Sequence, residues 1–161
     1  MKFIKKQSVW SWVFIGSLVF ALIGFIIYLA TSNAGFLAGR VIPSATLTIA
    51  TTCVALVVGI AYWVVKNFIK LPSLVEDIVL IVVGVLLSIS IMGFILGRVD
   101  VAADVWFIPV NYPQSEADTL NNAIIGIAFY FVSLVGVIVS CFGGKLNKVE
   151  VEKKSEKATK A

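Results

Sequence analysis

Residues 77–97 read DIVLIVVGVLLSISIMGFILG, and no charged side chain stands between Asp77 and Arg98. A helix needs about 20 consecutive, predominantly apolar residues to cross the hydrocarbon layer of a bilayer. The stretch is long enough to meet this requirement. It therefore predicts a membrane-spanning α-helix.

Three further stretches have the same character, at about residues 10–31, 45–65 and 121–142. The whole chain of 161 residues is 60% apolar and 14% charged, with a mean hydropathy of +1.02. Soluble domains are about half apolar and about a quarter charged. The sequence predicts an all-α integral membrane protein with four transmembrane helices. Short connections between the spans favour an antiparallel bundle.

The positive charges indicate how the bundle is oriented. All eleven lysines lie near the N-terminus, in the connection at 66–76, or after residue 144. The other connections, 32–44 and 98–120, are predicted to be outer loops and hold the two arginines. Cytoplasmic loops carry the excess of Lys and Arg, so both termini are expected in the cytoplasm. The preference for lysine over arginine suggests a bacterial plasma membrane. Because the lysines flank the predicted spans, membrane orientation explains the net charge of +4, and no nucleic-acid partner is expected.

The ends of the membrane domain, predicted as residues 1–144, carry local signals. Ser73 and Glu76 have capping-box spacing, which predicts a helix start near Ser73. The pair Gly143-Gly144 predicts the end of the fourth helix. Residues 145–161 alternate Lys with Glu and lack aromatics, so this cytoplasmic tail is expected to be disordered or weakly helical.

Small side chains predict where the helices meet, because lipid is as apolar as the helices and close packing must hold them together. The second and fourth spans supply six candidate packing residues: Thr48, Thr52, Gly59, Gly126, Ser133 and Gly136. Ser17, Ala21 and Gly24 extend the pattern to the first span, and Gly84 and Ser88 to the third. Each helix is thus expected to carry one packing stripe. An alternative makes the threonines the wall of a polar path, although threonines commonly bond back to their own helix.

A short repeat links the two halves of the chain. Residues 35–41 read GFLAGRV and residues 93–99 read GFILGRV, identical at five of seven positions. Such a repeat is expected from a tandem duplication of a two-helix hairpin, and internal repeats recur in membrane proteins.

The repeat carries both arginines of the chain, Arg40 and Arg98, and two interpretations stay open. In the first interpretation, the two arginine side chains reach the lipid headgroups or pair with Asp100 and Asp104, which would join the outer ends of the helices. Alternatively, their planar guanidinium groups flank an outward-facing anion site.

An apolar, proline-punctuated segment, 105–113, lies in the longest predicted loop and is expected on the bilayer surface or over the outer bundle. Loops on a rigid scaffold often carry recognition. The candidate residues for outer-face binding are Arg40, Arg98, Asp100, Asp104, Trp106 and Tyr112.

No catalytic constellation is evident in the sequence. Histidine is absent, and Cys53 and Cys141 form no CxxC pair. Asp100 and Asp104 offer two carboxylates, whereas calcium takes six to eight oxygen ligands. We expect no metal, no cofactor and no enzymatic activity.

These features favour a non-enzymatic membrane interaction protein, an accessory subunit of a larger complex such as a transporter, which uses the aromatic outer loop and the small-residue helix faces to bind partners. Its expected partners are membrane lipid and other membrane subunits or copies of itself. Two alternatives remain: a small oligomeric transporter or channel, and a membrane immunity protein against a peptide toxin.

Overall fold

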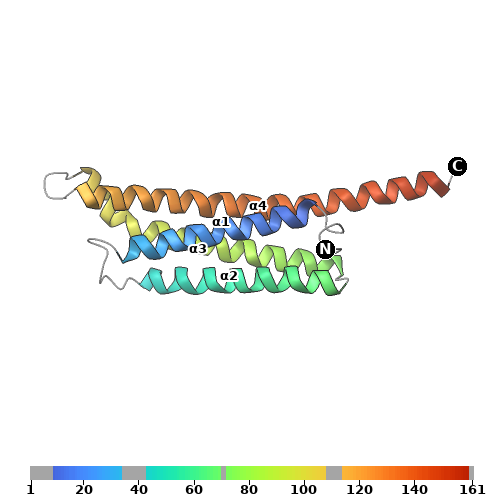
Figure 1. Ribbon diagram of the computed structural model, residues 1–161, viewed down its shortest axis with the longest axis horizontal. Helices are drawn as coiled ribbons and strands as arrows, with labels where there is room; N and C mark the ends of the chain where they lie inside the picture. Colours follow the sequence, from blue (N-terminus) through green and yellow to red (C-terminus); the bar gives the residue numbers. More distant parts are fainter. Residues whose placement is uncertain (1–8, 34–42, 70–71, 108–113, 160–161) are drawn as a thin grey trace, which may run out of the picture.

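The computed structural model describes residues 9–33, 43–69, 72–107 and 114–159, with only the backbone for residues 43, 44, 67, 100, 104, 115, 116 and 144–159. Four long helices run side by side along one elongated bundle (Figure 1). Their bounds are Val9–Ser32 for α1, Pro43–Phe68 for α2, Ser73–Phe107 for α3 and Gln114–Thr159 for α4.

Each helix contains a segment long and apolar enough to cross a membrane, as the sequence predicted. These segments are Val9–Ser32, Ala45–Lys66, Ser73–Val99 and Ala117–Gly143. Large apolar side chains such as Val57 and Ile81 point outward and are more than half exposed. The structure therefore indicates a multi-pass helical membrane protein.

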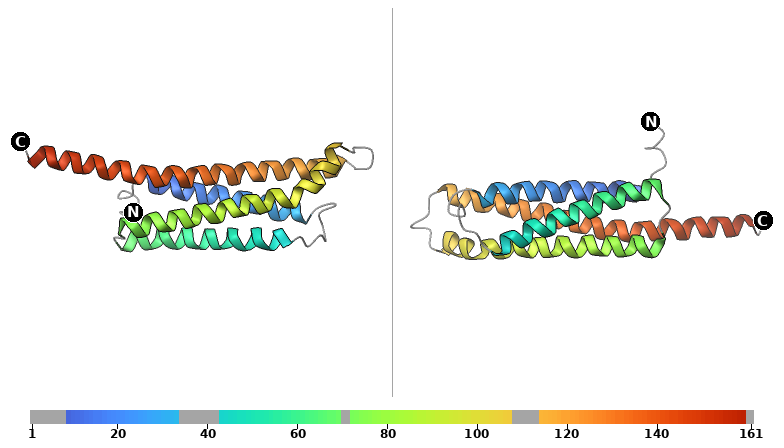
Figure 2. Two further views of the ribbon diagram at one scale, coloured as in Figure 1. Left: turned by 180° about the vertical axis from the view of Figure 1, so that it is seen from behind. Right: turned by 90° about the horizontal axis from the view of Figure 1, so that it is seen from below.

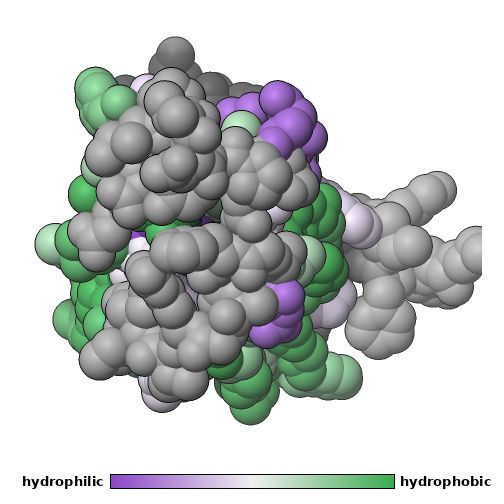
Figure 3. Space-filling view, turned by 90° about the vertical axis from the view of Figure 1, so that its left-hand side faces the viewer, coloured by the Kyte–Doolittle hydropathy of each residue, from purple (hydrophilic) through white to green (hydrophobic). Residues whose placement is uncertain are grey.

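One end of the bundle, here called the Arg98 end, gathers the C-terminal ends of α1 and α3 and the starts of α2 and α4 (Figures 1 and 2). Arg98 of α3 lies there against Ser32 of α1, with Nη2 2.7 Å from the serine Oγ. Seen from this end, hydrophobic side chains lie along the flanks, with a few separate hydrophilic patches among them (Figure 3).

The opposite end is here called the Lys66 end. Phe14 of α1 meets Tyr62 of α2 edge-on, with ring centroids 5.6 Å apart. The ammonium group of Lys66 on α2 lies 3.2 Å from a carboxylate oxygen of Glu76 on α3 and 3.1 Å from the Tyr62 hydroxyl. These contacts join α1, α2 and α3 at this end.

The helices close into a ring, in which α1 packs most extensively on α4 and α2 on α3. The contacts of α3 with α4 and of α1 with α2 complete the ring. The hairpins of the proposed duplication, α1 with α2 and α3 with α4, are thus the less extensive pairs. Residues 93–99 lie within α3, but residues 35–41 fall wholly outside the described residues, so the tandem repeat stays a prediction.

Large side chains fill the centre of the described bundle. Each is less than 2% exposed, and together they leave the interior packed rather than open: Tyr28, Val83, Leu87, Phe94, Tyr130 and Val137. Glycines let the helix backbones approach one another around these large side chains. A Cβ would lie 2.8 Å from Tyr130 Cδ2 at Gly24, 2.9 Å from Leu18 Cδ2 at Gly59, 2.8 Å from Ile27 Cγ2 at Gly126 and 2.8 Å from Ser17 Cβ at Gly136.

The predicted outer loop at 98–120 is largely helical. α3 continues to Phe107, and α4 already begins at Gln114. Val101 and Val105 are one turn apart and pack with Leu120 of α4 in a small second core. This apolar contact extends both helices beyond the ends that the sequence predicted.

α4 also continues past Gly143, where the sequence predicted its end, and projects beyond the bundle to Thr159 (Figure 2). Trp10 of α1 lies so close to Gly143 that an added Cβ would overlap its ring. Gly143 therefore serves helix packing at this position. The backbone of residues 145–159 is helical.

Candidate functional site

Arg98 is the most unusual side chain at the Arg98 end, because a cation there is only 6% exposed. Its Nη2 lies 3.0 Å from Thr31 Oγ1, 2.7 Å from Ser32 Oγ and 3.4 Å from the Tyr28 carbonyl oxygen. These acceptors belong to the last turn of α1. A cation is favoured at a helix C-terminus, where unpaired carbonyls carry partial negative charge.

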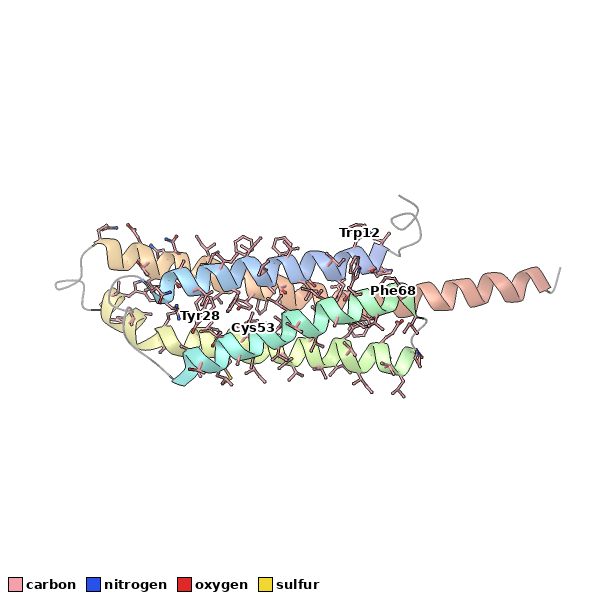
Figure 4. The ribbon with its side chains drawn as sticks, turned by 60° about the horizontal axis from the view of Figure 1, so that its bottom comes forward. Trp12, Tyr28, Cys53 and Phe68 are labelled. Carbon is pink, nitrogen blue, oxygen red and sulfur yellow. The ribbon has the colours of Figure 1, made fainter. Side chains whose placement is uncertain are left out.

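Two aromatic rings cover the Arg98 guanidinium. Its carbon lies 4.8 Å from the Tyr28 ring centroid and 4.6 Å from that of Phe94, and the two rings meet edge-on. Tyr28 lies toward the inside of the bundle from the end of α1 (Figure 4). Cation–π attraction is strongest where the cation is desolvated. Arg98 thus fastens α3 to the end of α1.

The predicted outer-face residues do not assemble into one described site. Arg98 turns inward, where the α1 terminus and two rings accept it, rather than outward to headgroups or an external anion. Trp106 is 54% exposed near the end of α3. Arg40 and Tyr112 lie outside the described residues, as do the side chains of Asp100 and Asp104. The shared site of two arginines therefore stays a prediction.

The candidate packing residues of α2 and α4 lie inside the bundle. Thr48, Thr52 and Ser133 are fully buried, and the glycines at 59, 126 and 136 each face a neighbouring helix. Thr52 Oγ1 bonds back to the Thr48 carbonyl and also lies 2.8 Å from the Tyr130 hydroxyl of α4. These groups hold helices together, and the space around them is filled.

α3 departs from this pattern. At Gly84 no atom beyond the neighbouring backbone of α3 lies within 4 Å of where a Cβ would stand, and Ser88 is exposed with its hydroxyl bonded to the Gly84 carbonyl. The prediction that these two residues pack inside the bundle is wrong. α3 turns a seam of mostly larger residues inward instead: Leu80, Val83, Leu87, Ser90 and Phe94. Exposed apolar residues of the same helix, Ile78, Ile81 and Val85, repeat at similar intervals, so spacing alone does not identify the inner face.

Gly84 and Ser88 lie in a groove between α3 and α4, here called the α3/α4 groove. It has room for about 380 Å³ and is lined mainly by apolar side chains. α3 and α4 diverge toward the Lys66 end (Figure 2). The groove lies in the half of the bundle next to that end. The lining residues include Asp77, Ile81, Gly84, Val85 and Ser88 of α3, with Leu134, Ile138, Cys141 and Phe142 of α4.

Within the described residues, no cluster of three or more His, Cys, Asp or Glu side chains could hold a metal ion. Cys53 is exposed on α2, whereas Cys141 lines the groove on α4. The groove therefore offers surface for packing, with one carboxylate at its end.

The four long apolar helices place the chain in the class of multi-pass helical membrane proteins. Comparison with protein families, curated proteins and solved structures found no match to this chain.

Proposed function

We propose that this chain is a non-enzymatic subunit of a larger membrane assembly, such as a transporter, and that it binds its partner laterally within the bilayer. The α3/α4 groove carries the proposal. It is a recess on the outer surface of the bundle, and the small residues Gly84 and Ser88 are among those that line it. Small residues let helix backbones approach closely, which is how helices associate in lipid.

The orientation follows from the charges. The Lys66 end holds Lys66, the start of α1 and the emerging part of α4, next to the lysine-rich terminal segments. By the positive-inside rule we place this end, and both termini, in the cytoplasm of a bacterial cell. The four spans then form an antiparallel bundle, and the α3/α4 groove lies in the cytoplasmic half of the membrane.

The packed interior favours a binding role over a path within one chain. Phe94, Tyr130 and Leu87 fill the centre, and the hydroxyl of Thr52 bonds to Tyr130 across it. A solute path would require a cavity connected along the bundle axis, lined by polar groups available to the solute. Transport by this chain would therefore depend on an assembly of several subunits.

Purification from the native membrane tests the proposed function. The tagged chain is extracted with its surrounding lipid in polymer nanodiscs, next to an equally tagged, unrelated four-span protein. We expect a second membrane protein in stoichiometric amount with this chain only. Recovery of the chain alone contradicts the proposal, as does a purified chain that makes liposomes permeable to ions or small solutes.

A further inference from the structure

α3 and α4 extend beyond the other two helices at the Arg98 end (Figure 1). The apolar span of α3 ends at Val99, but the helix continues to Phe107 and packs on the start of α4. Residues 99–107 of α3 and 114–120 of α4 are here called the extended tip. The small second core joins its two helices. The extended tip therefore reaches past the apolar span of α3 as a packed pair of helix ends.

Aromatic side chains of the extended tip are turned away from this core. Trp106 is 54% exposed and Phe107 is 82% exposed. Val99 is 50% exposed and lies two turns before Trp106, so these two side chains share one side of α3. Contiguous apolar surface that no part of the chain covers marks an interaction site.

Acyl chains of the bilayer do not reach the aromatic rings of the extended tip. Trp106 lies seven residues beyond Val99, which is about 10 Å along the helix axis. The headgroups add only about 5–7 Å to each side of the hydrocarbon layer. On α4, Ala117 packs against the second core, and the next residue, Asp118, is exposed. A carboxylate at this level is costly in hydrocarbon, so Trp106 lies open to the aqueous phase.

The sequence around the extended tip carries only negative charge. Residues 99–120 contain four acidic residues and no lysine or arginine. The preceding cation, Arg98, is turned inward and only 6% exposed. Arg40, outside the described residues, is the other cation that the sequence predicts on this side. Electrostatic complementarity therefore favours a positively charged partner.

The chemistry of the extended tip selects among possible partners. A second copy in the same orientation would present the same acidic residues, and like charges repel. Lysine and arginine side chains, in contrast, bind carboxylates and are attracted to the faces of aromatic rings, most strongly to tryptophan. Apolar side chains of the same partner would remove Trp106 and Phe107 from water. A polypeptide that combines basic and apolar residues meets both requirements.

We infer that the extended tip binds a basic, amphipathic peptide from the aqueous phase beyond the Arg98 end. Apolar side chains of the peptide pack on Val99, Trp106 and Phe107, and its lysines or arginines lie beside Asp118. This inference does not depend on the partner proposed for the α3/α4 groove, because the groove lies toward the opposite end of α3.

A designed probe peptide tests the inference. The chain is reconstituted in nanodiscs of phosphatidylcholine, whose headgroups carry no net charge. The probe is a short fluorescent peptide of lysines and a few leucines, and the matched control peptide has glutamate in place of lysine. We expect saturable binding of the lysine peptide above that of empty nanodiscs, weakened by salt, and no such binding of the glutamate peptide. Equal binding to empty nanodiscs, or equal binding of the two peptides, overturns the inference.

Substitutions test the aromatic and the acidic contributions separately. Trp106→Ala should weaken binding about tenfold, as is usual for an aromatic anchor. Trp12→Ala should leave it unchanged, because Trp12 is similarly exposed but lies at the Lys66 end (Figure 4). Joint replacement of Asp100, Asp104 and Asp118 by Asn should weaken binding about tenfold, since each exposed ion pair contributes modestly, whereas joint replacement by Glu retains it. Wild-type affinity of either weakened variant overturns the inference, provided that its thermal unfolding is unchanged.

Photo-crosslinking of the bound probe tests the location. A photoreactive residue replaces Phe107 or Phe68, which is 75% exposed at the Lys66 end (Figure 4). We expect the lysine peptide to crosslink to position 107 and not to position 68. Crosslinks at position 107 only to lipid or only to a second copy of the chain contradict the site.

Discussion

Gly84 and Gly126 occupy the middle of two neighbouring spans, yet their surroundings differ. A side chain at Gly126 would meet Ile27 and the Phe94 ring, while a side chain at Gly84 would meet nothing within 4 Å. The same contrast separates two serines of α3: Ser90 is fully buried, and Ser88 is exposed. A small residue in a membrane helix thus does not by itself show that another helix of the chain lies close, and only its neighbours in the structure decide this.

The largest expected effect is a difference in the free energy of unfolding between substitutions at these two glycines. Gly126→Leu should lower the free energy of unfolding by about 3 kcal/mol, because added atoms in a packed interior displace well-fitted rings. Gly84→Leu should change it by less than about 0.5 kcal/mol, as is usual for surface substitutions. Unfolding of both variants in mixed micelles measures the difference. Similar losses from the two substitutions would show that α3 does not face outward at Gly84.

Arg98 provides the next largest effect on the inward face of α3. Arg98→Met should cost about 2 kcal/mol, because the hydrogen bonds from the charged guanidinium to the Thr31 and Ser32 hydroxyls are lost, although both hydroxyls keep their bonds to α1 carbonyls. Arg98→Lys should restore only part of this, since an ammonium group lacks the planar guanidinium that lies over the Tyr28 and Phe94 rings. The same unfolding assay applies. Wild-type stability of Arg98→Met would contradict the fastening of α3 to α1.

Ser88 and Ser90 of α3 give the smallest effect. Ser90 Oγ lies 2.7 Å from Thr51 Oγ1 of α2, whereas the Ser88 hydroxyl bonds only within its own helix among the described contacts. Interhelical hydrogen bonds in membrane proteins average about 0.6 kcal/mol. Ser90→Ala should therefore lower the unfolding free energy by about that amount, and Ser88→Ala should leave it unchanged. A double-mutant cycle with Thr51→Val should show coupling to Ser90 and none to Ser88.

Much of the fold could be predicted from the sequence. Long uncharged stretches require four spans, and Gly59, Gly126 and Gly136 already stood out by their spacing. The inner face of α3 could not be found from its small residues, because large residues such as Leu87 and Phe94 pack there instead. The helical extension to Phe107 depends on contacts of Val101 and Val105 with α4, which no local pattern reveals.

The candidate site was less accessible to sequence reasoning. The repeat drew attention to Arg98. However, the inward direction of its side chain depends on hydrogen bonds to the end of α1, which lies far away along the chain. The α3/α4 groove arises where two helices diverge, so it follows from the path of both backbones. Neither feature is encoded in a contiguous motif.

Spin labels at positions 88 and 90 provide the most direct measurement of the two faces of α3. Ser88→Cys and Ser90→Cys are prepared with Cys53 and Cys141 replaced by alanine, and the purified chain is reconstituted in lipid without other proteins. We predict that the label at 88 is mobile and accessible to oxygen dissolved in the bilayer, and that the label at 90 is immobilised and shielded. An immobilised label at 88 together with an accessible label at 90 would contradict the outward direction of the α3 groove face.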